Sequence, residues 1–418
     1  MSPVEMMERV DKMAANRLWN GFDMRRIPVA VFDGTSTWLF GHDKPGDRFH
    51  PIDGRPDTYL YEGLHDSVRG NSVAVVNGVE TATVMLDGIA GDDVSVAASV
   101  VVHEMFHVFQ SARYAERGGN LVHMYDYPVE DVRQLQLRRL ETEAVSRALR
   151  AADGAISRKW CAEALKIRRR RYDGLPPEYV EFERATERHE GLAHYIEIRS
   201  LGRHTVELPE AEFAPDAVRK RCYPIGCAFA LLLDRFAENW SERFAGRHSD
   251  LDGLLASVVD AEADPDIGFG PEETDRALRQ AENDISDLLR KRRETKRSFY
   301  DRTGFLIELR FGEALRLTAM DPSNVHTVGE SEVRHSRFVR LEAGTDRIEM
   351  TDGDALTESA GKHPLFAGIC AVAFFAADEP VIERKSGMIA ADHPGLRIRL
   401  SESRVTESVV RKIGTNHF

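Results

Sequence analysis

One segment, Val100 to Phe109, limits what this chain can fold into more than any other. It reads V-V-V-H-E-M-F-H-V-F, so two histidines stand four residues apart and a glutamate follows the first of them. At helical spacing His103 and His107 lie on one face, and their neighbours are uncharged and mostly bulky. We therefore expect a buried helix whose N-terminus is capped by Asp92 or Asp93. A chain of 418 residues is long enough to enclose such a helix.

The same residues predict a metal site. Two imidazoles one helical turn apart can reach a single Zn²⁺ ion at about 2.0 to 2.1 Å, which is the H-E-x-x-H arrangement. Glu104 is then the candidate general base for a bound water. The alternative is that His103 and His107 are two core histidines with ordinary hydrogen bonds. We predict one zinc ion held by both histidines, with Glu104 as a catalytic residue.

Carboxylates downstream offer a third protein ligand, which a hydrolytic zinc site needs. Glu143 lies in the run E-T-E-A-V and Glu190 in H-E-G-L-A-H-Y, each inside a helical pattern. We prefer Glu190. Glu143 is the first alternative, and the neighbouring histidines His189 and His194 are the others.

The stretch E-G-L-A-H-Y from Glu190 to Tyr195 resembles the E-G-L-A-x-Y motif of gluzincin zinc metallopeptidases. The resemblance implies that Glu190 binds zinc, and that small residues beside it let its helix approach the H-E-x-x-H helix. His194 stands where relatives often carry an acidic residue. Glu190 lies 83 positions after His107, and no G-x-M-E-N element precedes His103. The resemblance therefore covers the catalytic stretch and does not extend to the aminopeptidase branch.

Tyr223, in the run Y-P-I-G, is a candidate donor to an oxyanion. The run resembles the Y-x-x-G start of the helix that follows the third-ligand helix in several gluzincins, and the resemblance implies that this tyrosine faces the substrate. A buried tyrosine at a helix start is the alternative.

Hydrophobic patterning divides the chain into elements. β-Hairpins are predicted at 27–40 and 72–86, each closed by a tight Asp-Gly or Asn-Gly turn. A short helix is expected before them. Helical periodicity then predicts helices at 93–116, 129–152, 156–172, 177–201, 224–238 and 272–297. Short strand-like runs follow at 305–311, 314–318, 338–341, 347–350, 369–375 and 396–400.

This order predicts an α+β protein. We expect an N-terminal helix and β-rich segment at 1–60, a zincin-like catalytic domain at 61–250, a helical connector at 251–299 and a β-rich accessory domain at 300–418. In zincins an edge strand before the metal helix often orients the substrate, and Val79 to Leu86 occupies that place in the order of elements. An extended peptide could pair there, although a hairpin that only covers the core is an equal alternative.

Charge and composition exclude several partners. The formal net charge is -13, which opposes binding to nucleic acid. The basic run around Arg168 to Arg171 is expected on a solvated helix face. No apolar stretch reaches the roughly 18 residues that span a bilayer, and the N-terminus lacks the pattern of a signal peptide. We expect a cytoplasmic protein without a membrane partner, with reduced cysteines at 161, 222, 227 and 370.

Together these features predict a zinc-dependent metallohydrolase that acts on a peptide or protein substrate. The alternative from another class is a zinc-binding regulatory or interaction protein with a zincin fold and no peptidase activity. Hydrolysis of a non-peptide amide or ester is a further alternative. The sequence does not predict the oligomeric state.

Overall fold

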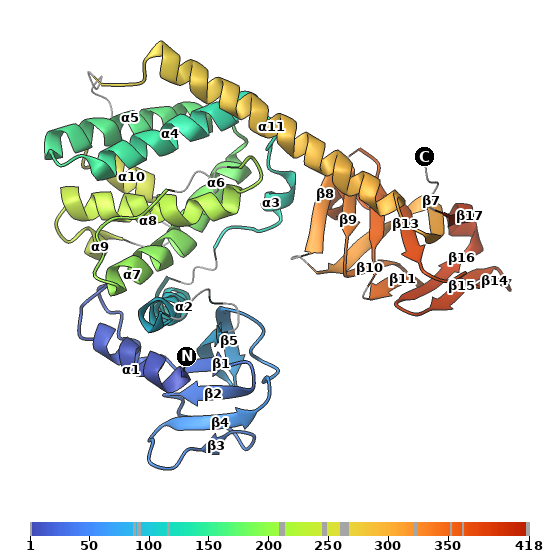
Figure 1. Cartoon of the computed structure of the whole chain (residues 1–418), viewed down its shortest axis with the longest axis horizontal. Helices are drawn as coiled ribbons and strands as arrows, with labels where there is room; N and C mark the ends of the chain where they lie inside the picture. Colours follow the sequence, from blue (N-terminus) through green and yellow to red (C-terminus); the bar gives the residue numbers. More distant parts are fainter. Residues whose placement is uncertain are drawn as a thin grey trace. The chain divides into compact units, whose positions relative to one another are not determined.

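The computed structural model describes residues 2–86, 89, 93–114, 118–208, 214–244, 249–259, 267–321, 324–351, 353–361 and 363–414. Helices and sheets are both present, which confirms the predicted α+β class. The chain divides into two compact units (Figure 1). Unit 1 contains Met1–Met124 and Val129–Ala281, and unit 2 contains Tyr125–Pro128 and Glu282–Phe418.

A six-stranded sheet forms the first layer of unit 1, in the order β3-β4-β2-β1-β6-β5. Both predicted hairpins are present, because β1 pairs antiparallel with β2 and β5 with β6. Asn77 and Gly78 take φ values of 46° and 86° at the second turn, the conformation that an Asn-Gly hairpin favours. The strands are β1 (Val29–Phe32), β2 (Ser36–Phe40), β3 (His50–Pro51), β4 (Thr58–Glu62), β5 (Ser72–Val76) and β6 (Val79–Met85).

The strand at the edge of the sheet is not the one that was predicted. β6 lies between β1, with which it pairs in parallel, and β5. Because both of its sides are occupied, the segment from Val79 to Leu86 cannot accept a further strand, and that expectation is wrong. β5 ends the order of strands in the sheet.

Helix α2 (Val94–Tyr114) packs between the sheet and the helices of unit 1 that follow it in the chain (Figure 1). Its range agrees with the predicted helix within two residues at each end. Asp93 caps it, since the aspartate side chain accepts from Ser95 N–H at 2.8 Å; Asp92 lies outside the described residues. Val101, Val102 and Phe106 are fully buried in the main core, so the helix is held on its apolar sides while the histidines face a cavity.

Two short helices of unit 1, at 240–243 and 251–256, were not among those predicted, and the predicted helices show two differences. The remaining helices of this unit are α1 (Pro3–Met13), α4 (Val132–Arg150), α5 (Gly154–Tyr172), α6 (Pro177–Thr186), α7 (Leu192–Ser200), α8 (Val218–Phe236), α9 (Trp240–Arg243) and α10 (Leu251–Ala256). α3 (His123–Asp126) and α11 (Pro271–Tyr300) contribute residues to both units.

The first difference is a turn of π-helix, Glu187–Gly191, between α6 and α7. It interrupts the single helix expected at 177–201. A Cβ atom on Gly191 would lie 2.5 Å from Gly226 Cα, and one on Gly226 would lie 2.6 Å from Glu187 O. The close approach that Gly191 permits is therefore to α8, and not to the H-E-x-x-H helix as expected.

The second difference is the start of α8. It begins at Val218, six residues before Pro224, which lies inside the helix. Tyr223 is consequently one full turn into the helix rather than at its start. A proline at this position lacks the N–H that would bond back along the helix.

Arginines and glutamates form a network of buried ion pairs between these helices. Arg168 contacts Glu141 and Glu187, and Arg171 holds Glu183 through two bonds of 2.6 Å. Each of these five residues is at most 1% exposed. Arg221 of α8 joins the network through Glu141 at 2.9 Å.

The network corrects the expectation of a solvated face at 168–171. Arg169 and Arg170 are exposed, but Arg168 and Arg171, three residues apart, lie on the inner face of α5 and meet acidic residues of other helices. The sequence gives their charge but not the partners that neutralise it.

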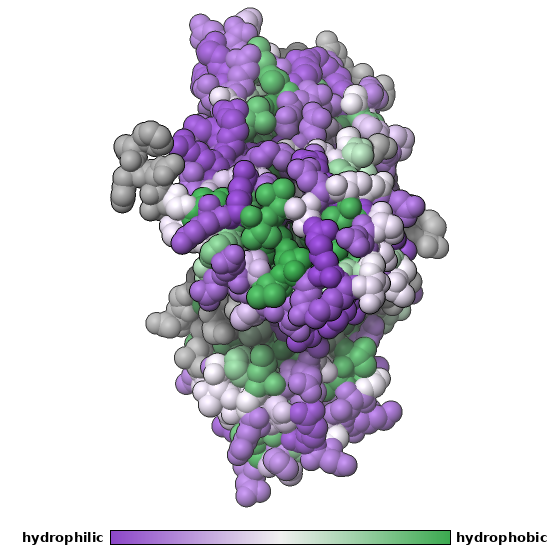
Figure 2. All heavy atoms as spheres, turned by 90° about the vertical axis from the view of Figure 1, so that its right-hand side faces the viewer, coloured by the Kyte–Doolittle hydropathy of each residue, from purple (hydrophilic) through white to green (hydrophobic). Residues whose placement is uncertain are grey.

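Unit 2 is built on a long strand, β7 (Gly304–Met320), which pairs with β10, β13 and β17. It joins two runs that the sequence predicted as separate strands. The others are β8 (Val325–Gly329), β9 (Glu332–His335), β10 (Phe338–Ala343), β11 (Asp346–Thr351), β12 (Ala355–Ser359), β13 (Ile369–Ala376), β14 (Ile382–Lys385), β15 (Met388–His393), β16 (Leu396–Ser401) and β17 (Val405–Ile413), with a short helix α12 (Pro364–Ala367). The face drawn in Figure 2 is mostly hydrophilic, with apolar side chains in separate patches.

Candidate metal centre

Three side-chain atoms from two helical segments converge in unit 1. His103 and His107 come from α2, and Glu190 from the π turn. Glu190 Oε2 lies 3.3 Å from His107 Nε2 and 3.6 Å from His103 Nε2. The two Nε2 atoms are 3.1 Å apart. This group could hold a metal ion, and it contains the predicted histidines together with the preferred third ligand.

The His107 ring is oriented by Gln110, one turn further along α2. The Gln110 amide nitrogen donates to the carbonyl oxygens of Arg188 and His189, each at 3.1 Å. Its oxygen therefore faces His107 Nδ1 at 2.9 Å and accepts from it. With the proton on Nδ1, the lone pair of His107 Nε2 points into the site.

The His103 ring is oriented in the same way by Glu197 of α7. Glu197 Oε2 lies 3.2 Å from His103 Nδ1 and 3.0 Å from His194 Nδ1. A carboxylate that accepts from the outer nitrogen of a ligating histidine fixes its tautomer and raises its basicity. His103, His194 and Glu197 also form a second group of possible ligands. We interpret them as support for His103, because its Nδ1 donates to the carboxylate.

The centre as a whole favours a positive charge. Burial lowers the pKa of His103, but hydrogen bonds to Glu190 and Glu197 outweigh it and raise the pKa to about 10. Burial likewise opposes ionisation of Glu190, yet its bonds to both histidines lower its pKa far below the usual range. Both shifts have the same cause, since the carboxylates around the two histidines favour a positive charge there, carried by a proton or by a metal ion.

Glu104 and Tyr223 border the same centre. Burial raises the pKa of Glu104, although His103 and His107 act against it. Burial and the neighbouring carboxylate of Glu190, to which Tyr223 is hydrogen-bonded, raise the pKa of the phenol. The Tyr223 ring lies nearly parallel to the His103 ring, at 15° and 6.3 Å between centroids.

The alternative third ligands lie away from the converging atoms or make other contacts. Glu143 is on α4, 43% exposed and paired with Arg147 at 2.7 Å. The His189 ring packs on His107 at 4.1 Å, and burial lowers its pKa to about 3. His194 contacts Glu197 rather than the converging Nε2 atoms.

The centre opens into a cavity of about 760 Å³. One wall carries the metal-site residues, and another is formed by Asn71, Ser72, Val73 and Val75 in and beside β5. β5, the edge strand of the sheet, therefore borders the centre, whereas the order of elements in the sequence had placed the neighbouring strand at this edge.

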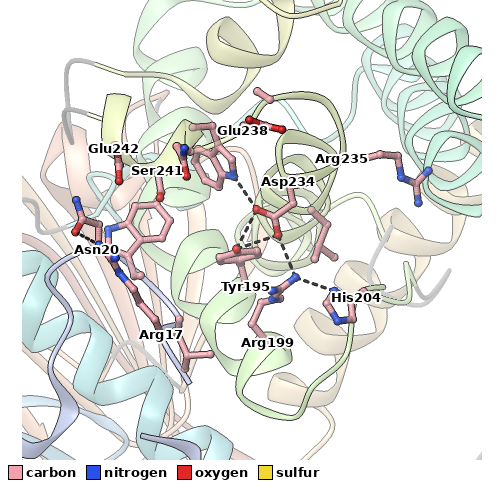
Figure 3. A pocket seen from close by; sticks show the side chains of 16 residues that line it. Arg17, Asn20, Tyr195, Arg199, His204, Asp234, Arg235, Glu238, Ser241 and Glu242 are labelled. Carbon is pink, nitrogen blue, oxygen red and sulfur yellow. Dashed lines mark hydrogen bonds and ion pairs between the residues drawn. The ribbon is translucent and has the colours of Figure 1, made fainter. Parts of the chain in front are cut away.

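A separate cavity of about 580 Å³ lies on another side of α7 (Figure 3). Several of its polar groups contact one another. Asp234 accepts from the Tyr195 hydroxyl, the Trp240 indole and Arg199, at 2.8 to 3.2 Å, and the His204 ring lies 2.7 Å from Arg199. None of the converging metal-site residues lines this cavity, so we assign it a packing role.

Gln110, Glu197 and Arg219 are functional candidates that the sequence analysis missed. Gln110 follows His107 by three residues and Glu197 follows Glu190 by seven, and both spacings keep a helical face. These spacings could have identified both residues from the sequence. Arg219 donates to Glu190 Oε1 at 2.7 Å, and no motif marked it.

Comparisons with known proteins identify no relative, since no family model, curated protein or solved structure matches the chain. In the described part of the chain, no helix is both long enough and apolar enough to cross a membrane.

Proposed function

We propose that this protein is a zinc-dependent peptidase with a gluzincin-like centre of His103, His107 and Glu190. The observation that carries the proposal is the spacing of their three ligand atoms, 3.1, 3.3 and 3.6 Å. Ligands held about 2.0 to 2.1 Å from a tetrahedral zinc ion lie roughly 3.3 to 3.4 Å from one another. Two imidazoles and one carboxylate are also a donor set that suits zinc.

Zinc held there would act as a Lewis acid and lower the pKa of a bound water. Glu104 then serves as general base, taking the water proton and passing it to the leaving amine. Its raised pKa suits this role, because a base works best when its pKa approaches the ambient pH.

Tyr223 is the proposed oxyanion donor. The phenol is protonated at neutral pH, so the hydroxyl is able to donate a hydrogen bond. Within the described residues β5 is the last strand of its sheet, so it offers an edge to an extended peptide, and it borders the same cavity.

Two observations weigh against the alternative of a zinc-binding regulatory protein. Glu104 is 7% exposed and lines the cavity with the three ligand residues, and a structural zinc site has no need of a base there. Structural sites are also closed by a fourth protein ligand; among the described residues, the group with Glu190 contains three.

The first experiment is metal content by plasma mass spectrometry on protein prepared without added metal. We expect about one zinc per chain in the wild type and in Glu143→Ala, and a clear loss in Glu190→Ala. Glu143→Ala is the matched control, since it removes the alternative carboxylate. Metal-free wild type would refute the proposal, and retention of zinc by Glu190→Ala would remove Glu190 from the ligand set.

The second experiment tests the general base. Glu104→Gln should keep the metal and lose at least ~100-fold in the rate of peptide cleavage. Glu178→Gln, the same change at an exposed site on α6, should leave the rate unchanged. A Glu104→Gln protein with full activity would exclude Glu104 as the base.

A further inference from the structure

We propose that the cavity beside the metal centre binds a carboxylate group of the substrate, so that the protein selects peptides with an acidic residue or a free C-terminus next to the cleaved bond. This inference rests on the proposed peptidase function and adds its substrate class. The cavity has a volume of about 770 Å³ and shares two wall residues, Arg219 and Tyr223, with the cavity of the metal centre. A substrate at the centre therefore lies next to it.

The charges that line the second cavity are mainly positive. Arg203, Arg219 and Lys220 are its cationic residues, against one carboxylate, Glu207. His194 lies on the same wall. In a chain with a formal net charge of -13, such a local excess of cations is a recognition feature for an anion.

The cavity of the metal centre has the opposite balance. Glu80, Glu104, Glu190 and Glu197 line it, and Arg219 is its one arginine or lysine among the described residues. A substrate carboxylate is repelled on that side and attracted on the other. The two cavities together therefore give a substrate one preferred direction across the centre.

Arg203 and Lys220 are available to a ligand. Both are exposed, and within the described ranges neither makes an ion pair with another residue. Arg219 differs, because it already donates to Glu190 Oε1 and lies 5.3 Å from the centre of the Tyr223 ring. We therefore treat Arg219 as a positioning residue of the metal ligand, and Arg203 and Lys220 as the specificity residues.

The chemistry of the wall fits a carboxylate on a short apolar stem. A guanidinium can bind a carboxylate through two parallel hydrogen bonds. Ile198, Val206 and Pro224 supply apolar surface beside the cations, where the methylene groups of an acidic side chain can pack.

The test measures binding without turnover. Fluorescence anisotropy measures the binding of three labelled peptides of one length to the Glu104→Gln protein supplied with zinc. The first peptide has blocked ends and central glutamates, and the second has glutamines in their place. The third is the glutamine peptide with a free C-terminus. We expect at least one carboxylate peptide to bind roughly tenfold more tightly than the blocked glutamine peptide. The first and third peptides distinguish a side-chain from a terminal carboxylate.

Charge reversal supplies the decisive comparison. Arg203→Glu with Lys220→Glu should abolish the preference for the carboxylate peptides. Arg25→Glu with Lys12→Glu makes the same change at exposed sites on other elements and should preserve it. Equal binding of all three peptides, or a preference that survives the reversal in the cavity, would overturn the inference. Failure of the peptidase proposal would appear separately, as a wild type without zinc or peptide cleavage.

Discussion

At the scale of single residues, the proposed metal centre depends on side chains that are not among its three proposed ligands. Gln110 and Glu197 accept from the outer nitrogens of the two histidines, and so direct both Nε2 lone pairs to one point. The H-E-x-x-H pattern predicts which residues bind, but the tautomer of each ring is decided by these second contacts.

A substitution at Glu197 tests this support. Glu197→Gln keeps the size of the side chain but replaces the anionic acceptor of His103 with a neutral amide. We expect zinc affinity to fall by about 10- to 100-fold without a change in fold. Competitive titration with a chromophoric chelator measures the affinity, with Glu143→Gln as control. An affinity within twofold of the wild type would mean that Glu197 does not support the ligand.

At the scale of elements, one contact between helices positions Glu190, the proposed third ligand. Gly191 and Gly226 bring the π turn and α8 into backbone contact, while Arg168 holds Glu187 at the start of the same turn. The turn is therefore fixed at both ends, and Glu190 lies between them. A π-helical turn inside a helix is often found at functional sites.

An added methyl group tests the contact. In Gly191→Ala the new Cβ would lie 2.5 Å from Gly226 Cα, and because backbone cannot move aside cheaply we expect a loss of about 1 to 3 kcal/mol in unfolding free energy. Gly154→Ala is the control, since a Cβ there meets nothing within 4 Å. Urea unfolding followed by tryptophan fluorescence suits the measurement, because all four tryptophans lie in unit 1. Equal midpoints for both variants would contradict the close contact.

At the scale of the whole molecule, buried histidines make the stability of unit 2 depend on pH. Unit 2 buries two histidines, His335 and His363, at 0% and 6% exposure. Burial lowers the pKa of each to about 4, below the usual value of about 6.5. The unfolded chain therefore binds more protons than the folded unit between these two values, and unit 2 must lose stability as the pH falls through that range.

This linkage predicts a measurable pH dependence. Between pH 7 and pH 5 each buried histidine should cost unit 2 about 1 to 2 kcal/mol. Hydrogen exchange of peptides from β9, β12 and β13, corrected for the intrinsic rate, reports the opening of this unit. His335→Gln should reduce the pH dependence, whatever its effect on stability at pH 7. An unchanged dependence in His335→Gln would assign the acid sensitivity to other groups.

The sequence by itself determined the parts that local patterns encode. Periodicity predicted α2, α4, α5 and α11 closely, and turn residues predicted both N-terminal hairpins. The spacing of His103, Glu104 and His107 predicted a shared helical face, because a helix fixes the geometry of residues four apart.

Only the tertiary structure decided which distant segments of the chain contact one another. It made β5 rather than β6 the edge strand, buried Arg168 and Arg171 among glutamates of other helices, and started α8 before Pro224. It also brought Glu190 to the histidines and left Glu143 on the surface. Sequence spacing does not specify these outcomes, because they depend on which faces meet when helices and sheet pack around one core.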